Sequence, residues 1–173
     1  MRAQDWMTTD VRTCSPETSL NDAADHMWRG DCGILPVLDG ERVVGVITDR
    51  DACMGAYLAG RVLADIRVRD AMASKVFTCR TTDSIEDVLR CMSDHQVRRI
   101  PIVDGRGTLA GILSVNDLAR HILALTDGRE RARIEARFVE ALASICATRS
   151  SATVPETTSS PDVARRPLAA GRT

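Results

Sequence analysis

The chain has 173 residues, of which 44% are hydrophobic and 27% are charged, and its formal net charge at pH 7 is −1. A chain of this length hides roughly 70% of the surface that it exposes when unfolded, and its composition lacks the low hydrophobicity and high net charge of a disordered protein. The near-neutral charge and the scarcity of aromatic residues, 3% of the chain, argue against nucleic acid or an anionic membrane as a partner.

No apolar run approaches the ~20 residues that a membrane helix needs, and the first residues, MRAQDWMTTD, lack the apolar stretch of a signal peptide. The six cysteines contain no C-x-x-C pair and no zinc-finger spacing. These observations predict a cytoplasmic protein with reduced thiols, without a membrane partner and without a metal site.

The same series of elements is predicted twice along the chain. Each series has an extended segment, a helix, two short apolar strands and a second helix. The first series is predicted at 11–14, after Ser19, at 34–38, at 43–47 and at about 48–59. The second is predicted at 76–79, after Ser84, at 99–103, at 109–113 and at about 115–125.

Local signals mark the starts of the helices and the turns between the strands. Ser19 and Ser84 are each followed three residues later by an aspartate, a pattern typical of helix N-caps. Asp39-Gly40 and Asp104-Gly105 separate the paired strands and are typical of hairpin turns. Each half of the chain is therefore predicted to be a β-α-β-β-α unit.

The two halves are duplicates of one another. With a shift of 65, residues 7–40 align on 72–105 with ten identities in 34 positions, and a shift of 66 then pairs Gly45 with Gly111 and Asp51 with Asp117. Cys14 and Cys79 are also equivalent, which allows two interpretations: buried small side chains, or thiols that meet at a twofold axis. The duplication indicates an internal repeat architecture.

These observations predict an α+β fold in which two β-α-β-β-α repeats, at 5–62 and 68–126, pack through their sheets about a pseudo-twofold axis. One unit of about 60 residues would be marginally stable alone, so the two should share an interface. A further helix is predicted at 128–146, with an apolar stripe that either packs on the body or forms a dimer contact. Residues 147–173 are predicted to be a disordered tail.

The second strand of each repeat runs into a helix through similar residues. Thr48-x-x-Asp51 and Ser114-x-x-Asp117 place a hydroxyl at the helix start and a carboxylate one turn later. This arrangement suits a sugar diol beside a phosphate, because a carboxylate accepts from hydroxyls and the first helix N–H groups favour an anion. The same pattern is also a capping box, so from spacing alone both interpretations stay open.

The paired strands LPVLD and IPIVD, the paired junctions GVITDRD and GILSVND and the duplication itself resemble a tandem pair of CBS domains, also called a Bateman module. The resemblance covers about residues 5–125. The chain is most similar in its motifs to small stand-alone bacterial CBS-pair proteins of the hypoxia-response type. No nucleophile–base pair, P-loop or dinucleotide motif occurs, so we expect no enzymatic activity.

The resemblance implies that adenosine-containing ligands, such as AMP, ADP or ATP, bind in clefts between the two repeats. In this family the aspartate of the junction motif holds the ribose hydroxyls, and the hydroxyl residue before it lies near the ribose or phosphate. The corresponding residues here are Thr48, Asp51, Ser114 and Asp117.

The resemblance also implies an adenine wall and phosphate contacts at the strand prolines. The wall is expected at Ile34 and Leu35 in the first repeat, and at Arg99 and Ile100 in the second. Arg98 and Arg99 are expected to contact phosphates, since a guanidinium fork fits phosphate oxygens. Gly33 and Ile34 occupy the equivalent positions of the first repeat, where Arg50 is expected to supply charge, so the two clefts should differ in affinity.

The predicted function is a regulatory sensor that binds an adenine nucleotide, requires no cofactor, forms a homodimer and signals to a protein partner by population shift. Three alternatives are a ligand-silent dimer that acts as a scaffold, a nucleic-acid-binding module using the tail, and a redox or metal sensor acting through cysteines.

Overall fold

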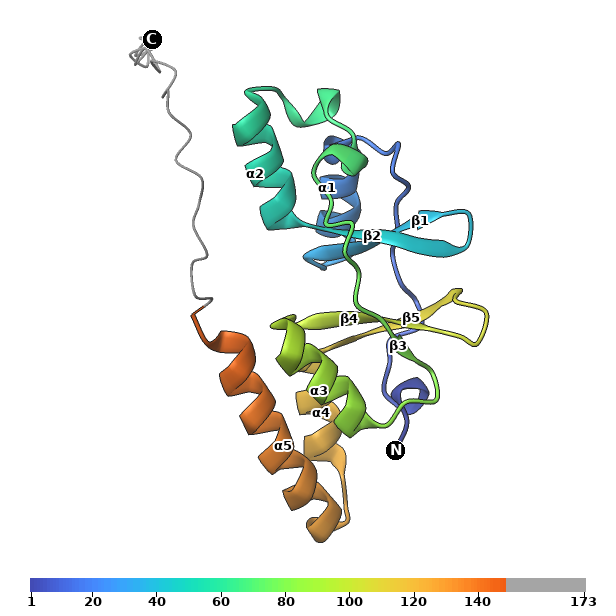
Figure 1. Ribbon diagram of the computed structural model, residues 1–173, viewed down its shortest axis with the longest axis vertical. Helices are drawn as coiled ribbons and strands as arrows, with labels where there is room; N and C mark the ends of the chain where they lie inside the picture. The colour runs from blue at the N-terminus through green and yellow to red at the C-terminus, as the bar shows by residue number, and fades with distance from the viewer. Residues whose placement is uncertain (149–173) are drawn as a thin grey trace, which may run out of the picture.

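The computed structural model describes residues 1–148, so the predicted tail lies outside the described residues except for its first two positions. Two helix–hairpin units face each other through their strands, as Figure 1 shows. The first unit contains α1 (Leu20–Arg29), β1 (Ile34–Asp39), β2 (Arg42–Thr48) and α2 (Asp49–Ala59). The second contains β3 (Cys79–Arg80), α3 (Ile85–His95), β4 (Arg99–Val103), β5 (Leu109–Ser114) and α4 (Val115–Ala124), and is followed by α5 (Gly128–Cys146). Short 3-10 turns lie at η1 (Ala3–Asp5), η2 (Leu63–Asp65) and η3 (Val68–Asp70).

The predicted N-caps are confirmed. The Ser19 hydroxyl accepts a hydrogen bond from the backbone N–H of Asp22 at 3.1 Å, and Ser84 does the same for Asp87 at 3.1 Å. Each bond satisfies one of the N–H groups that a helix start leaves without an intrahelical partner. The order of the elements also confirms the predicted α+β fold with two equivalent repeats.

The extended segments predicted at 11–14 and 76–79 form less strand than expected. In the first repeat only a single parallel bridge, Cys14 to Val37, is made, and in the second only Cys79–Arg80 pairs with β4. The reason is that both segments cross between the units. Thr8 pairs with Ile112 before the first crossing, and Ala73 pairs with Val46 before the second. Most residues of the crossings consequently have no strand beside them.

The two hairpin turns differ. Gly40 takes the left-handed conformation, with φ of +60°, as an Asp-Gly turn requires. In the second repeat Gly107, not Gly105, has the positive φ, +85°. The carboxylate of Asp104 accepts from the backbone N–H groups of Arg106 and Thr108 instead. The inserted residue thus moves the left-handed position two residues past the predicted Asp-Gly pair.

The segments that lead into the two repeats are exchanged between the packing units. Ala3 and Trp6 are buried in the core of the second unit, whereas Ile66 and Val68 are buried in the core of the first. The packing units therefore cross the repeat boundaries expected at 5–62 and 68–126. This exchange ties the units together at two places related by the pseudo-twofold axis.

Of the two arrangements expected for α5, the structure shows the one in which this helix packs on the body of the molecule. It packs against α3 and α4, and Ile134, Ala141 and Ile145 are buried in the core of the second unit. None of the helices within residues 1–148 is both long and apolar enough to cross a membrane.

The cysteines do not meet at the axis. Cys14 is buried in the first core and Cys79 in the second, and all six thiols are free. Burial raises the pKa of the Cys14 thiol to about 11. Burial also raises the pKa of Cys79 well above its ordinary value, so these thiols are held protonated as small apolar side chains.

Candidate functional site

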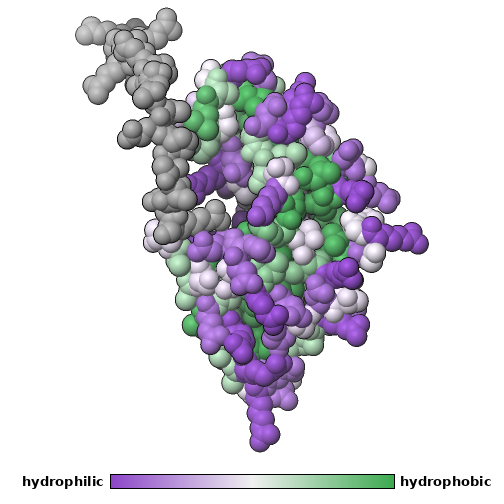
Figure 2. All heavy atoms as spheres, in the orientation of Figure 1, coloured by the Kyte–Doolittle hydropathy of each residue, from purple (hydrophilic) through white to green (hydrophobic). Residues whose placement is uncertain are grey.

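Two clefts lie where the units meet, and each contains one of the predicted junctions. The first, the Asp51 cleft, has a volume of about 1030 Å³. Figure 2 shows a hollow on this side of the molecule, between the start of α2 and the end of α5. The residues that line it are Ile34, Val46, Thr48, Arg50, Asp51, Ala73, Lys75, Val76, Phe77, His95, Gln96, Val97, Arg98, Arg99, Pro101, Ile145, Cys146 and Ala147.

The second, the Asp117 cleft, has a volume of about 830 Å³. It combines the start of α4 with residues 8–12, which belong to the segment that crosses between the units. The residues that line it are Thr8, Asp10, Val11, Arg12, Arg29, Gly30, Asp31, Cys32, Ile34, Arg99, Ile112, Ser114, Asn116, Asp117, Ala119 and Arg120.

Each cleft is composite, because the helix start of one repeat faces the strand entry of the other. Arg98 lies with Asp51 of the first repeat, and Cys32 lies with Asp117 of the second. Ile34 and Arg99, which are equivalent, line both clefts. Each of these two residues also pairs in its own hairpin with the junction hydroxyl residue, Thr48 or Ser114. They therefore occupy the centre of the interface.

The helix starts have nearly identical geometry. Oδ2 of Asp51 accepts from the Thr48 hydroxyl at 2.7 Å and from the Thr48 backbone N–H at 3.0 Å. Oδ2 of Asp117 accepts from the Ser114 hydroxyl at 2.6 Å and from its N–H at 2.9 Å. Both junctions are therefore capping boxes, and the cap uses a single carboxylate oxygen of each aspartate. The second oxygen, Oδ1, takes no part in either cap.

The surroundings of that second oxygen distinguish the clefts. Arg120, one turn further along α4, donates to Oδ1 of Asp117 and forms an ion pair with it. The equivalent position of α2 is Met54, so within the described residues Asp51 has no such arginine. Asp117 is also the more buried of the two, with 7% of its surface exposed. Asp51 is thus the more accessible carboxylate.

The clefts also differ in charge. Arg50, Lys75, Arg98 and Arg99 line the Asp51 cleft, and its one carboxylate among the described lining residues is Asp51. The Asp117 cleft combines the basic residues Arg12, Arg29, Arg99 and Arg120 with the acidic residues Asp10, Asp31 and Asp117. Arg98 and Arg50, expected on different sides, thus lie in one cleft, which is the more positive.

Sequence reasoning missed an aromatic group in the Asp51 cleft. Phe77 and His95 stack with ring centroids 3.6 Å apart, and Lys75 Nζ lies 5.3 Å from the Phe77 centroid. The signal in the sequence is the position of Phe77 in the extended segment at 76–79, which aligns with 11–14 of the first repeat and places Phe77 opposite Arg12.

Two predicted residues lie elsewhere. Leu35 and Ile100 are fully buried, one in each core, and neither lines a cleft. Their side chains point away from the interface because side chains alternate along a strand, and Ile34 and Arg99 occupy the cleft-facing positions. At these two positions only backbone groups can contact an adenine base.

The sequence profile of the CBS domain matches residues 3–54 and 68–124. The CBS domain-containing protein YhcV of Bacillus subtilis is 35% identical over 116 residues, which cover 67% of this chain and 81% of the relative. Hypoxic response protein 1 of Mycobacterium tuberculosis is 31% identical over 121 residues, which cover 69% of this chain and 84% of the relative.

Two solved structures are similar in fold. The crystal structure of Hypoxic Response Protein I with two coordinated zinc ions has a TM-score of 0.64 at 31% identity, covering 70% of this chain and 98% of that one. CBSX2 in complex with AMP has a TM-score of 0.63 at 28% identity, covering 71% and 96%. Within residues 1–148 of the present chain, no three His, Cys, Asp or Glu side chains gather as a metal site would require.

Proposed function

The chain belongs to the CBS domain family, and on this premise we propose that it is a non-enzymatic regulatory module that binds adenosine-containing ligands in both clefts between its repeats. The observation that carries the proposal is the combination, in each cleft, of a capped junction aspartate from one repeat with an arginine from the other. The AMP complex of CBSX2, a protein similar in fold, supports the choice of ligand class.

Each group of the ligand has a matching group in the Asp51 cleft. Oδ1 of Asp51 accepts from ribose hydroxyls while Oδ2 keeps the helix cap. Arg98 and Arg50 face the phosphates with guanidinium donors, and the first N–H groups of α2 add a favourable dipole. Val76, Val97 and the Phe77 ring offer apolar surface to the base.

The Asp117 cleft contains equivalent groups, but their surroundings are less favourable for a nucleotide. Arg120 competes with a ribose for Oδ1 of Asp117, and two further carboxylates, Asp10 and Asp31, oppose a phosphate. We therefore assign the higher affinity for adenine nucleotides to the Asp51 cleft. We also expect this cleft to prefer the nucleotides whose phosphate chains are more highly charged.

Binding changes the equilibrium between states of the module, and a protein partner senses the change. A ligand shifts such states only by its difference in affinity for them. We place this activity, which amounts to energy sensing, in the cytoplasm, where free thiols such as the six of this chain stay reduced.

The homodimer is part of the proposal, and one helical face is available for it. On the second repeat α5 covers α3, including Ser93, whereas no helix within residues 1–148 covers the equivalent position of the first repeat in this way. Trp28, which is equivalent to Ser93, is 87% exposed there. Tyr57, Leu58 and Val62, at the end of α2 and just after it, are further exposed apolar side chains of the first repeat, and together with Trp28 they define what we call the α1/α2 face. This face also favours the second candidate function, a ligand-silent dimeric scaffold.

A melting experiment separates the two functions. The full chain is melted alone and with millimolar AMP, ADP, ATP, NAD or S-adenosylmethionine. A ligand at a hundred times its dissociation constant adds about 2.7 kcal/mol, which raises the melting temperature by several degrees. The double variant Asp51→Ala, Asp117→Ala should lose the rise. A flat panel for the wild-type chain would reject the sensor and leave the scaffold.

A further inference from the structure

The end of α5 breaks the symmetry between the clefts. Ile145, Cys146 and Ala147 line the Asp51 cleft, together with groups from both repeats. Among the described residues that line the Asp117 cleft, none comes from α5. Since the duplicated part of the chain ends before α5, this wall has no counterpart in the other repeat.

Hydrogen bonds tie this end of α5 to the segment that carries the cleft arginines. The side-chain amide of Gln96 donates to the carbonyl oxygen of Ser144 at 3.0 Å and to that of Ala147 at 3.3 Å. The Ser144 hydroxyl donates to the carbonyl oxygen of Ser93 at 3.3 Å. Gln96 ends α3 in the left-handed conformation and stands two residues before Arg98. The position of the α5 end and that of Arg98 are therefore mechanically linked.

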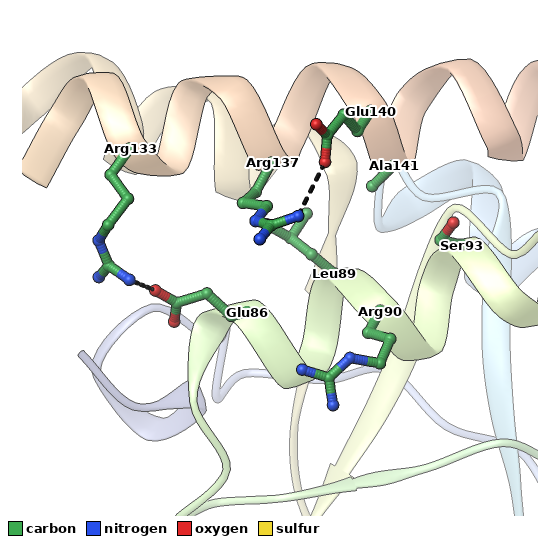
Figure 3. A pocket seen from close by; sticks show the side chains of 8 residues that line it. All are labelled: Glu86, Leu89, Arg90, Ser93, Arg133, Arg137, Glu140 and Ala141. Carbon is green, nitrogen blue, oxygen red and sulfur yellow. Dashed lines mark hydrogen bonds and ion pairs between the residues drawn. The ribbon is translucent and has the colours of Figure 1, made fainter.

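The body of α5 is held independently of the cleft. Figure 3 shows Arg133 of α5 pointing to Glu86 of α3, with which it forms an ion pair, and Leu89 facing Ala141 between the helices. Ile134 of α5 is fully buried in the core of the second unit. Only the last turn, with Ile145 buried and Cys146 exposed, contacts the cleft. A ligand can thus change the docking of this turn without releasing the helix.

We propose that the last turn of α5 is a wall of the Asp51 cleft that holds the bound adenine nucleotide, so that occupancy of this cleft alone stabilises the docked end of α5. This inference rests on the proposed function. The coupling is reciprocal, because a docked turn that raises ligand affinity must itself be favoured by the ligand to the same degree. The C-terminal end of α5 consequently responds to ligand occupancy of the Asp51 cleft only.

Cys146 reports on the proposal in the full chain. Alkylation by iodoacetamide, followed residue by residue with mass spectrometry, should slow at Cys146 when the nucleotide chosen by the melting panel is added. Cys53, the other exposed thiol on a helix, lies outside the Asp51 cleft and beside Trp28 of the α1/α2 face, so its rate depends on the dimer and serves as the internal control that the nucleotide should leave unchanged. The slowing should persist in Asp117→Ala and disappear in Asp51→Ala.

Gln96→Asn tests the link itself. Asparagine tolerates the left-handed conformation, but its side chain is one methylene too short to reach α5. In an Asp117→Ala background it should weaken nucleotide binding about fivefold, the lower end of ordinary coupling between sites. In an Asp51→Ala background it should leave binding unchanged. Gln4→Asn, at an exposed position of η1, is the matched control.

The outcomes separate the inference from the proposed function. Calorimetric binding without any change at Cys146 overturns the inference and leaves the sensor standing. Faster alkylation of Cys146, or equal protection in Asp51→Ala, also overturns it, because the turn would then be expelled or respond to the other cleft. Absence of binding in the wild-type chain removes both.

Discussion

Met72 lies so close to Gly45 that a β-carbon on this glycine would come within 2.5 Å of the methionine sulfur. Met7 lies in the same way against Gly111, at 2.6 Å from such a β-carbon. These contacts join the exchanged chain segments to the hairpins of the opposite repeats. They explain why both a methionine and a glycine recur in the duplication.

Gly111→Ala should destabilise the fold by about 2 kcal/mol, within the range of overpacked cores. The new methyl group would also come 2.8 Å from the carbonyl oxygen of Thr8, a backbone atom that cannot rotate away. Gly45→Ala should cost less, because its nearest backbone atom, the carbonyl oxygen of Ala73, is 3.2 Å away. Urea unfolding measures both, with Gly105→Ala as the control in open space. Equal stability of Gly111→Ala and Gly105→Ala would contradict the close contact.

Arg98→Ala should weaken binding of ADP or ATP at the Asp51 cleft about tenfold, since a hydrogen bond to a charged group contributes roughly 1.5–3 kcal/mol. Adenosine, which lacks the phosphates, should lose little affinity. Calorimetry in an Asp117→Ala background isolates this cleft. Arg106→Ala, in the exposed turn between β4 and β5, is the control. An equal loss for adenosine and ATP would remove Arg98 from the phosphate site.

Arg120→Met should raise the affinity of the Asp117 cleft, because it frees Oδ1 of Asp117 from its ion pair. The reciprocal change, Met54→Arg, should lower the affinity of the Asp51 cleft by creating that pair. Each variant is measured by calorimetry with the aspartate of the other cleft replaced by alanine. Weaker binding in Arg120→Met would instead make Arg120 a phosphate ligand.

Stability should fall above pH 9 through Cys14. The pKa of this thiol is raised by burial from 9.0 to about 11, so the folded state keeps a proton that the unfolded chain loses. The stabilisation is complete below pH 9 and is lost as the pH rises toward 11. The melting temperature of Cys14→Ala should therefore decline less steeply over this range than that of the wild type. Cys53→Ala, which changes an exposed thiol, should decline as the wild type does.

Trp28→Ser should dissociate the proposed homodimer, because it removes the most exposed aromatic side chain of the α1/α2 face and installs the residue found at the equivalent position, Ser93. Light scattering after size exclusion gives the mass. Val139→Ser, which removes a 63% exposed apolar side chain from α5, should remain dimeric. A wild-type monomer, or dissociation by Val139→Ser alone, would reject this face as the interface.

The sequence by itself determined the repeats, the order of their elements and the starts of the helices. These features depend on local interactions: Ser19 and Ser84 cap helices through residues three positions away, and the apolar periodicity selects each strand and helix. Duplication also made Asp51 and Asp117 equivalent, and Thr48 and Ser114 likewise. Equivalent residues occupy the same position in their repeats, however, and this does not show which residues of the other repeat each one contacts.

Only the tertiary structure decided which residues share a cleft. Arg98 lies with Asp51 and the end of α5, at separations in sequence that no local pattern relates. The pairing of Arg120 with Asp117 likewise follows from side-chain geometry, since an i, i+3 spacing permits an ion pair without requiring one. Leu35 and Ile100 were directed into the cores by the pleat of their strands. Non-local packing therefore made two clefts of unequal charge from two repeats with equivalent junctions.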